Sequence, residues 1–360
     1  MKILIIALSG IGDALMFSPA LKLLRQKYES SQIDLLSMFK GVEELYLRNP
    51  DISNVYYWNF MKENPVKSLL FVLELRKIRY DATINVYPSN RWPYNLISFL
   101  IGAPIRIGHI YNHTNFRSLN FLNNRKIKED DLKHNVLENV ALLEFLNINV
   151  SQAVPPLQVI LTKDDETSAE QWLIDAQINS SDLIVGFHAG SATLKNHINR
   201  RWAPEKFAEL AKILIDKYKA KVLLFGGPDE YELNDNINSL TGTACYVVKV
   251  KSLMTTAALM RKCKVFVVND SGLMHIASGL QLPVVTIFAY TNPNYVHPWM
   301  TDYILVRHEL ECSPCFYYSP RPAKCKLKEN KFKCIREISV NEVFLQVEKM
   351  LIKTGAVSVG

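Results

Sequence analysis

Short apolar runs alternate with amphipathic stretches along this chain, and they form two successive series. In the first series we expect strands at 2–8, 32–38, 54–58, 82–86 and 105–110, and helices at 13–28, 41–48, 66–80, 92–101 and 132–146. In the second we expect strands at 183–188, 221–225, 245–250, 265–268 and 284–288, and helices at 204–218, 230–240, 253–262, 273–280 and 340–352. Strands separated by helices of this length are typical of βαβ units with a parallel sheet. The sequence therefore predicts an α/β protein with two Rossmann-like domains facing a central cleft.

The length of 360 residues agrees with two domains, because one domain averages about 100–200 residues. The stretch 151–163, which contains Pro155 and Pro156, has the composition of a passage between domains. We expect domains at 1–165 and 166–340, followed by a helix and tail at 341–360. Ligands of such sheets bind at the carboxyl ends of the strands, so the residues of a site should follow the strands directly.

The composition excludes several classes of protein. With 48% hydrophobic and 21% charged residues, the chain is neither intrinsically disordered nor fibrous. It contains no run of about 18 apolar residues, which argues against a membrane span. The apolar opening stops at Ser9 and Asp13 soon follows, which favours a buried first strand over a secretory leader. We therefore expect a cytoplasmic protein.

The net charge of +7 indicates an anionic ligand or surface. Part of the surplus is local, since residues 316–335 hold six lysines and arginines against the single Glu329. This stretch lacks the interleaved aromatic and basic pattern of a nucleic-acid module, and a phosphate-bearing lipid or sugar explains the charge as well. A solvated basic loop with no partner is the simplest alternative.

The turn after the first expected strand reads Ser9-Gly10-Ile11-Gly12-Asp13-Ala14-Leu15. It does not fit a dinucleotide site, because Leu15 replaces the third glycine and Asp13 would repel a pyrophosphate at the helix amides. Two roles stay open for Asp13. Either its side chain caps the helix, or it is a catalytic base that the helix dipole keeps ionised and the glycines leave accessible.

Three turns after expected strands of the second half are candidates for a ligand site, at 188–191, 225–230 and 268–275. In the third, Ser271 and Gly272 begin a helix whose free N–H groups suit a pyrophosphate. His275 lies four residues after Ser271, where it can donate a proton or a hydrogen bond to a phosphate. The sequence has no D-x-D motif for a metal-bound nucleotide. Helix N-termini and basic side chains would then receive the charge of a leaving group.

Four of the six cysteines form a spaced set, Cys312, Cys315, Cys325 and Cys334, whereas Cys245 and Cys263 fit small core positions. In a cytosolic chain this spacing favours a thiolate metal site over disulfides. Four separate reduced cysteines, or two disulfides in an oxidising compartment, are the alternatives.

Several segments together carry a family resemblance, and they are Gly12-Asp13-Ala14-Leu15, Ser18-Pro19-Ala20-Leu21, His188-Ala189-Gly190, Arg201-Trp202-Ala203-Pro204, Phe225-Gly226-Gly227-Pro228, Asn269-Asp270-Ser271-Gly272-Leu273-Met274-His275 and Phe288-Ala289-Tyr290-Thr291-Asn292-Pro293. In this order, over nearly the whole chain, they resemble glycosyltransferase family 9, the ADP-heptose-dependent heptosyltransferases of bacterial lipopolysaccharide synthesis. The resemblance implies the GT-B architecture, with an acceptor-binding first domain, a nucleotide-sugar-binding second domain and a C-terminal helix that returns to the first. It also implies an inverting transfer of heptose without a catalytic divalent ion.

The resemblance further implies roles for particular residues. Asp13 would be the base that deprotonates the acceptor hydroxyl. The donor would be held by His188, Gly190, Ser191, Arg200, Arg201, Glu230, Asp270, Ser271, Gly272 and His275. One of the arginines would neutralise the pyrophosphate, and Asp229 or Glu230 would meet the ribose or adenine. A related group of protein heptosyltransferases carries an iron-bearing cysteine finger in the region of the four cysteines, which sets iron beside zinc as the structural metal.

The acceptor stays open at this point. A lipopolysaccharide core or a related glycan is our first expectation, with peripheral contact at the inner face of the inner membrane. A protein acceptor such as an autotransporter is the second. A non-catalytic protein that binds carbohydrate or nucleic acid through the basic cysteine loop is the third, although we expect no nucleic-acid partner.

Overall fold

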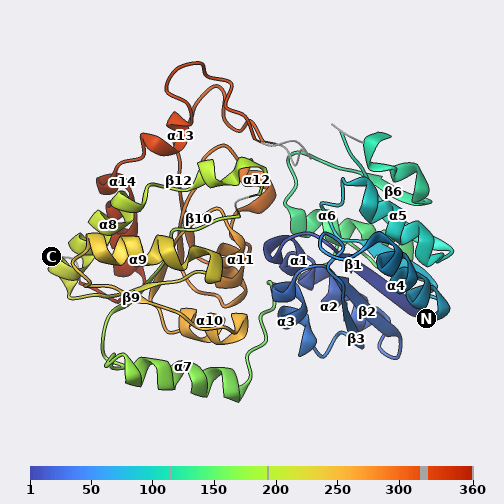
Figure 1. Ribbon diagram of the computed structural model, residues 1–360, viewed down its shortest axis with the longest axis horizontal. Helices are drawn as coiled ribbons and strands as arrows, with labels where there is room; N and C mark the ends of the chain where they lie inside the picture. The colour runs from blue at the N-terminus through green and yellow to red at the C-terminus, as the bar shows by residue number, and fades with distance from the viewer. Residues whose placement is uncertain (113–115, 193, 317–322, 359–360) are drawn as a thin grey trace. The chain divides into compact units, whose positions relative to one another are not determined.

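The computed structural model describes residues 1–112, 116–192, 194–316 and 323–358, and it contains two compact units (Figure 1). The first unit is Met1–Ile160, and the second begins at Leu161. Each unit holds one six-stranded parallel sheet with helices. The predicted α/β class with two parallel sheets is therefore confirmed. Among the described residues, no helix is both long and apolar enough to cross a bilayer.

The first sheet has the strand order β3-β2-β1-β4-β5-β6. Its strands are β1 (Lys2–Ala7), β2 (Gln32–Ser37), β3 (Asn54–Tyr57), β4 (Ala82–Asn85), β5 (Ile105–Ile110) and β6 (Arg125–Lys128). Its helices are α1 (Ile11–Leu15), α2 (Ser18–Lys27), α3 (Lys40–Leu47), α4 (Pro65–Lys77), α5 (Trp92–Ile101) and α6 (Asn135–Ala141), with 3-10 turns at Phe116–Ser118, Asn120–Leu122 and Leu142–Leu146. The central strand β1 pairs in parallel with β2 and β4.

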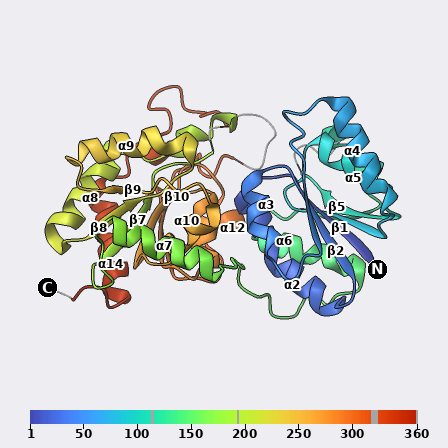
Figure 2. The same ribbon diagram turned by 60° about the horizontal axis from the view of Figure 1, so that its bottom comes forward.

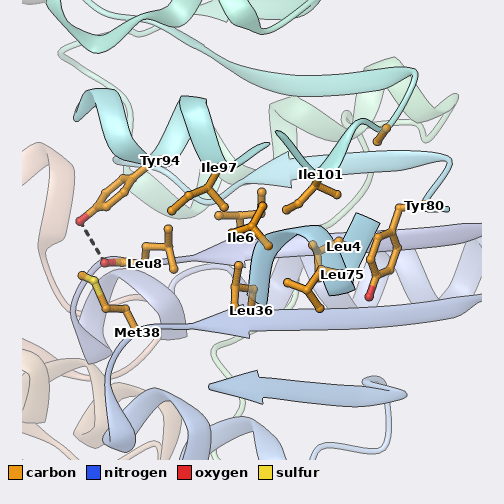
Figure 3. Close-up of a cluster of buried hydrophobic side chains, with 12 residues drawn as sticks. Leu4, Ile6, Leu8, Leu36, Met38, Leu75, Tyr80, Tyr94, Ile97 and Ile101 are labelled. Atoms are coloured by element: carbon orange, nitrogen blue, oxygen red, sulfur yellow. Dashed lines mark hydrogen bonds between the residues drawn. The ribbon is translucent and has the colours of Figure 1, made fainter. Parts of the chain in front are cut away.

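Helices α4 and α5 pack side by side and cover one face of this sheet. Figure 3 shows how Leu75 of α4 and Ile97 and Ile101 of α5 point toward Leu4 and Ile6 of β1. Burying each such side chain stabilises the fold by about 1.5–3 kcal/mol. This apolar layer fixes the position of β1, and with it the start of the turn that carries Asp13.

The second sheet has the order β12-β11-β10-β7-β8-β9. Its strands are β7 (Ile184–His188), β8 (Lys221–Leu224), β9 (Tyr246–Val247), β10 (Val265–Asn269), β11 (Val284–Ile287) and β12 (Tyr303–Val306). Its helices are α7 (Lys163–Asp175), α8 (Pro204–Tyr218), α9 (Tyr231–Leu240), α10 (Leu253–Met260), α11 (Gly272–Gly279), α12 (Pro293–Val296), α13 (Lys333–Arg336) and α14 (Val340–Lys353), with 3-10 turns at Leu194–Arg200 and Pro228–Glu230.

Several elements differ from the sequence-based expectation. The expected helix at 13–28 is divided into α1 and α2, and Pro19 stands in the first turn of α2, where a residue without an N–H is tolerated. Helix α7 was not expected, and it follows the passage expected at 151–163; a capping box between Thr162 and Asp165 begins it. Strands β6 and β12 were not expected, because both lie at sheet edges, where apolar alternation is weak.

The C-terminal helix α14 is part of the second unit. A capping box between Ser339 and Glu342 begins it, and its buried face, with Val343 and Val347, packs on α8 and on strands β10–β12. The family resemblance had this helix return to the first domain. That expectation is corrected here, because the apolar face of α14 completes the cover of the second sheet.

Candidate functional site

The three candidate turns of the second unit meet at one edge of its sheet. Strand β7 pairs in parallel with β10 on one side and with β8 on the other, so the carboxyl ends of these strands lie together (Figure 2). The strand order reverses between β7 and β10, which is where open α/β sheets bind ligands. Residues from the three turns contact one another there.

His188, the last residue of β7, links the other two turns. Its Nδ1 atom lies 2.9 Å from Oγ of Ser271, and its Nε2 atom lies 2.9 Å from Oε2 of Glu230. A carboxylate only accepts hydrogen bonds, so Nε2 donates to Glu230, and Nδ1 is the ring atom that meets the Ser271 hydroxyl. Both ring nitrogens are occupied by protein groups. His188 therefore joins the turns that carry Ser271 and Glu230, and its contact with the donor stays a prediction.

The carboxylate of Glu230 stays ionised although it is largely buried. Burial raises its pKa, but the neighbouring His188 and Arg201 more than offset this and hold the pKa below its ordinary value. Gly190 makes room for it, since a Cβ atom at residue 190 would lie 1.8 Å from Oε1 of Glu230. The glycine is thus required by the approach of Glu230, which explains its place in the turn.

Both predicted arginines are paired with carboxylates. Nη1 of Arg200 lies 2.8 Å from Oδ2 of Asp270, and Nη2 of Arg201 lies 3.2 Å from Oε1 of Glu230. Nε of Arg201 also donates to Oγ of Ser191 at 3.3 Å. The two guanidinium groups therefore meet two carboxylates at this edge, and neither is an unpaired cation. An anion would have to share them with Asp270 and Glu230.

Helix α11 begins at Gly272 and has Ser271 as its N-cap, yet the Ser271 side chain makes no capping hydrogen bond to the helix. The contact with His188 accounts for this, because it holds the Ser271 hydroxyl. The first N–H groups of a helix have no partner within the helix, so they suit an anion. His275 lies one turn further and is buried, and its Nδ1 atom has no partner among the described residues.

His275 is neutral at pH 7. Burial, with smaller contributions from Arg200 and His297, lowers the pKa of His275 to about 4, although Asp270 acts in the opposite direction. A neutral imidazole donates one hydrogen bond and carries no charge. The role expected for His275 thus narrows to that of a hydrogen-bond donor.

Asn269 is a residue of the site that our sequence analysis did not single out. Its Nδ2 atom donates to the Ala189 carbonyl at 2.7 Å, and its Oδ1 atom accepts from the Trp202 amide at 3.0 Å. Through these hydrogen bonds Asn269 connects the end of β10 with the turn after β7 and with Trp202, which follows the two arginines in the sequence. The signal was its place as the last buried residue of a strand in the Asn269-Asp270-Ser271-Gly272 segment.

Asp13 lies in the first unit, after the strand at which that sheet also reverses its order. It stands in the first turn of α1 and is partly buried, and the N-cap residue is Gly10. A Cβ atom at Gly10 would meet nothing within 4 Å, so this glycine leaves open space beside the helix. The turn is held by Ser9, whose Oγ donates to the Pro88 carbonyl at 2.8 Å. Asp13 is thus not the N-cap residue of α1.

The four cysteines of the C-terminal loop line one cavity, together with Tyr290, Phe316 and Phe332. Burial, with smaller contributions from the other three cysteines, raises the pKa of Cys334 to about 11. In the described parts of the chain, no three His, Cys, Asp or Glu side chains are placed to hold a metal ion. The donor set has the chemistry of a zinc or iron site, but its geometry in this structure does not support one. Residues 317–322 of the loop lie outside the described residues.

The comparisons with known proteins agree with this arrangement. The profile of glycosyltransferase family 9 (heptosyltransferase) matches residues 70–326. The chain is 27% identical to lipopolysaccharide heptosyltransferase 2 of Salmonella typhimurium, over 83% of this chain and 85% of that protein. Its fold is similar to that of a family 9 glycosyl transferase from Veillonella parvula, with a TM-score of 0.78, 21% identity and coverage of 98% and 97% of the two chains.

A second solved structure with this fold is Escherichia coli heptosyltransferase WaaC with ADP, at a TM-score of 0.69 and 18% identity, over 99% of this chain and 100% of the other. The family profile covers well over half of the sequence, and it includes the strand-end turns of the second unit. This chain belongs to glycosyltransferase family 9, the heptosyltransferases.

Proposed function

We propose that this enzyme transfers heptose from ADP-heptose to a lipopolysaccharide core, with inversion at the anomeric carbon and without a catalytic divalent ion. The observation that carries this proposal is the strand-end cluster of the second unit, where Asp270, Ser271 and His275 surround the N-terminus of α11. Similarity to lipopolysaccharide heptosyltransferase 2 supports the sugar and the acceptor, and a solved heptosyltransferase with ADP supports the donor.

In this proposal the pyrophosphate lies at the first N–H groups of α11, starting at Gly272. His275 donates a hydrogen bond to a phosphate oxygen from its neutral ring. Arg200 and Arg201 share their guanidinium groups between the phosphates and their present carboxylate partners. A bidentate guanidinium has enough N–H groups to do both. Glu230 and Ser191 line the same edge, on the side of the nucleoside.

Asp13 supplies the base. As the acceptor oxygen attacks the anomeric carbon, Asp13 takes its proton, and the bond between that carbon and the ADP oxygen breaks. ADP leaves with the electron pair from the face opposite to the attack, which inverts the anomeric carbon. The charge that develops on the phosphate is stabilised by the amides of α11, by His275 and by the arginines.

The test is a turnover assay with the purified chain, ADP-heptose and heptose-free lipopolysaccharide core. We expect ADP release that depends on the acceptor, and a product one heptose heavier. UDP- and GDP-linked sugars serve as donor controls. Transfer from one of these and none from ADP-heptose would overturn the donor assignment. Transfer to a polypeptide in place of the core would move the acceptor to a protein.

We also propose that the enzyme acts in the cytoplasm, at the inner face of the inner membrane. A lipopolysaccharide core carries a lipid, so an enzyme that modifies it must work beside a bilayer. A structural zinc or iron ion at Cys312, Cys315, Cys325 and Cys334 stays a prediction that rests on the C-x-x-C spacing of the sequence, since the described side chains are not placed to hold an ion.

A further inference from the structure

Helix α4 carries apolar side chains on the side that faces solvent. Val66, Leu69, Leu70 and Leu73 are exposed by 65%, 45%, 58% and 38%. Their spacing places them on one helical face. The opposite face holds Val72 and Leu75, which are buried in the core of the first unit. The exposed stripe is therefore additional to the face that stabilises the fold.

Helix α5 continues this surface. Trp92 and Phe99 are exposed by 53% and 44%, and they lie seven residues apart on one helical face. Both helices pack side by side on the same face of the sheet, so their outer faces point away from it together (Figures 1 and 2). We call Val66, Leu69, Leu70, Leu73, Trp92 and Phe99 the outer apolar face. Several large apolar side chains exposed on neighbouring helices mark an interaction site.

The charge around the outer apolar face is positive. Residues 59–79 hold Lys62, Lys67, Arg76, Lys77 and Arg79 against Glu63 and Glu74. One lysine is neutralised locally, since Nζ of Lys77 lies 2.6 Å from Oε1 of Glu74. Lys67 is exposed beside the leucines. An apolar stripe with basic borders and a tryptophan is the pattern of a helix that lies in the interface of an anionic bilayer.

We propose that the outer apolar face of α4 and α5 docks this enzyme on the surface of an anionic lipid bilayer. A second copy of the chain is a poorer occupant, because a symmetric contact through this face would bring two basic borders together. Helix α4 has 13 residues, which is too short to span a bilayer, so it lies along the surface. The docking proposal rests on the proposed function in one respect, since the lipid-linked acceptor is the reason for the enzyme to work beside a bilayer.

The experiment is co-sedimentation of the full chain with vesicles of phosphatidylethanolamine and phosphatidylglycerol at about three to one, and with vesicles of phosphatidylcholine alone. We expect binding to the anionic vesicles that weakens with salt. Leu70→Ser/Leu73→Ser should reduce it about tenfold or more, because two inserted side chains are lost. Lys67→Gln should reduce it about fivefold. Ile174→Ser, at a residue of α7 that is 66% exposed, is the matched control and should bind like wild type.

Equal binding by wild type and by Leu70→Ser/Leu73→Ser would overturn the proposal, as would absence of binding to anionic vesicles. A dimer that this double variant dissociates, without lipid binding, would assign the face to a second copy. Turnover with a delipidated, soluble core should be unchanged in the double variant. A chain that binds vesicles but does not use ADP-heptose would disprove the proposed function alone, and one that turns over without binding vesicles would disprove the docking alone.

Discussion

The Nδ1 atom of His188 lies 2.9 Å from Oγ of Ser271, and this contact joins the turns after β7 and β10. With Glu230 on its other nitrogen, the row of serine, imidazole and carboxylate has the order of groups that activates a serine nucleophile. Here the serine begins helix α11, at the helix end that suits an anion. We therefore infer that His188, held by Glu230, orients the Ser271 hydroxyl and prevents it from making a capping hydrogen bond to α11.

If His188 positions Ser271, His188→Ala should weaken ADP binding about tenfold, the effect of roughly one misdirected hydrogen bond. Ser271→Ala should weaken it similarly, and the double variant should add little to either change, because both act through one contact. Calorimetric titration with ADP measures this. His308→Ala is the control, since His308 pairs with Glu342 on the surface of the same unit. Additive losses in the double variant would show two independent roles.

Asp13→Asn should lower turnover by roughly 10²–10⁴-fold and leave the affinity for ADP almost unchanged, because a positioned base acts on the acceptor hydroxyl. Steady-state rates and ADP titration separate the two effects. Asp164→Asn is the matched control, as Asp164 is an exposed acidic residue in the first turn of α7. Near-normal turnover of the Asp13 variant would leave that carboxylate with a purely structural role in α1.

Many elements could be predicted from the sequence, and the misses have physical reasons. The bounds of α5 and α8 agree with the prediction, since a proline lies in the first turn of each helix and apolar spacing continues to its end. Helix α7 was missed because its polar composition resembles a linker. The turns of the site were found because they follow strands. The sequence did not show that Gly190 makes room for Glu230. That contact arises only because β7 and β8 are neighbours in the sheet, which brings Glu230 close to residue 190.

The neutral, buried His275 should make the fold less stable in acid. In the unfolded chain its pKa returns to 6.5, whereas in the fold it is about 4. Between these two pKa values the unfolded state binds a proton at His275 and the folded state does not. The free energy of unfolding therefore falls as the pH drops from about 6.5 toward 4. Near pH 5 this single group should lower the free energy of unfolding by roughly 2 kcal/mol relative to neutral pH. Urea unfolding of wild type and His275→Gln across this range measures it. The Gln variant should lose less stability than wild type as the pH falls. If the free energies of unfolding of both proteins fell in parallel with pH, a buried neutral histidine would be contradicted.

The cavity lined by the four loop cysteines leads to a prediction about metal content. Four thiolates around one ion would supply folding energy to a loop rich in lysine that has little apolar content of its own. Chain purified without chelator should then contain about one zinc or iron ion, lost in Cys312→Ser/Cys315→Ser. Cys245→Ala should keep the ion, because Cys245 is buried beside Thr241, outside this cavity. Because the described side chains do not converge on a metal, ion binding has to draw the sulfur atoms together. Elemental analysis with thiol titration distinguishes a metal-bound from a metal-free loop. A metal-free, fully active chain in which all four loop thiols titrate would show that these cysteines line a cavity and bind no metal.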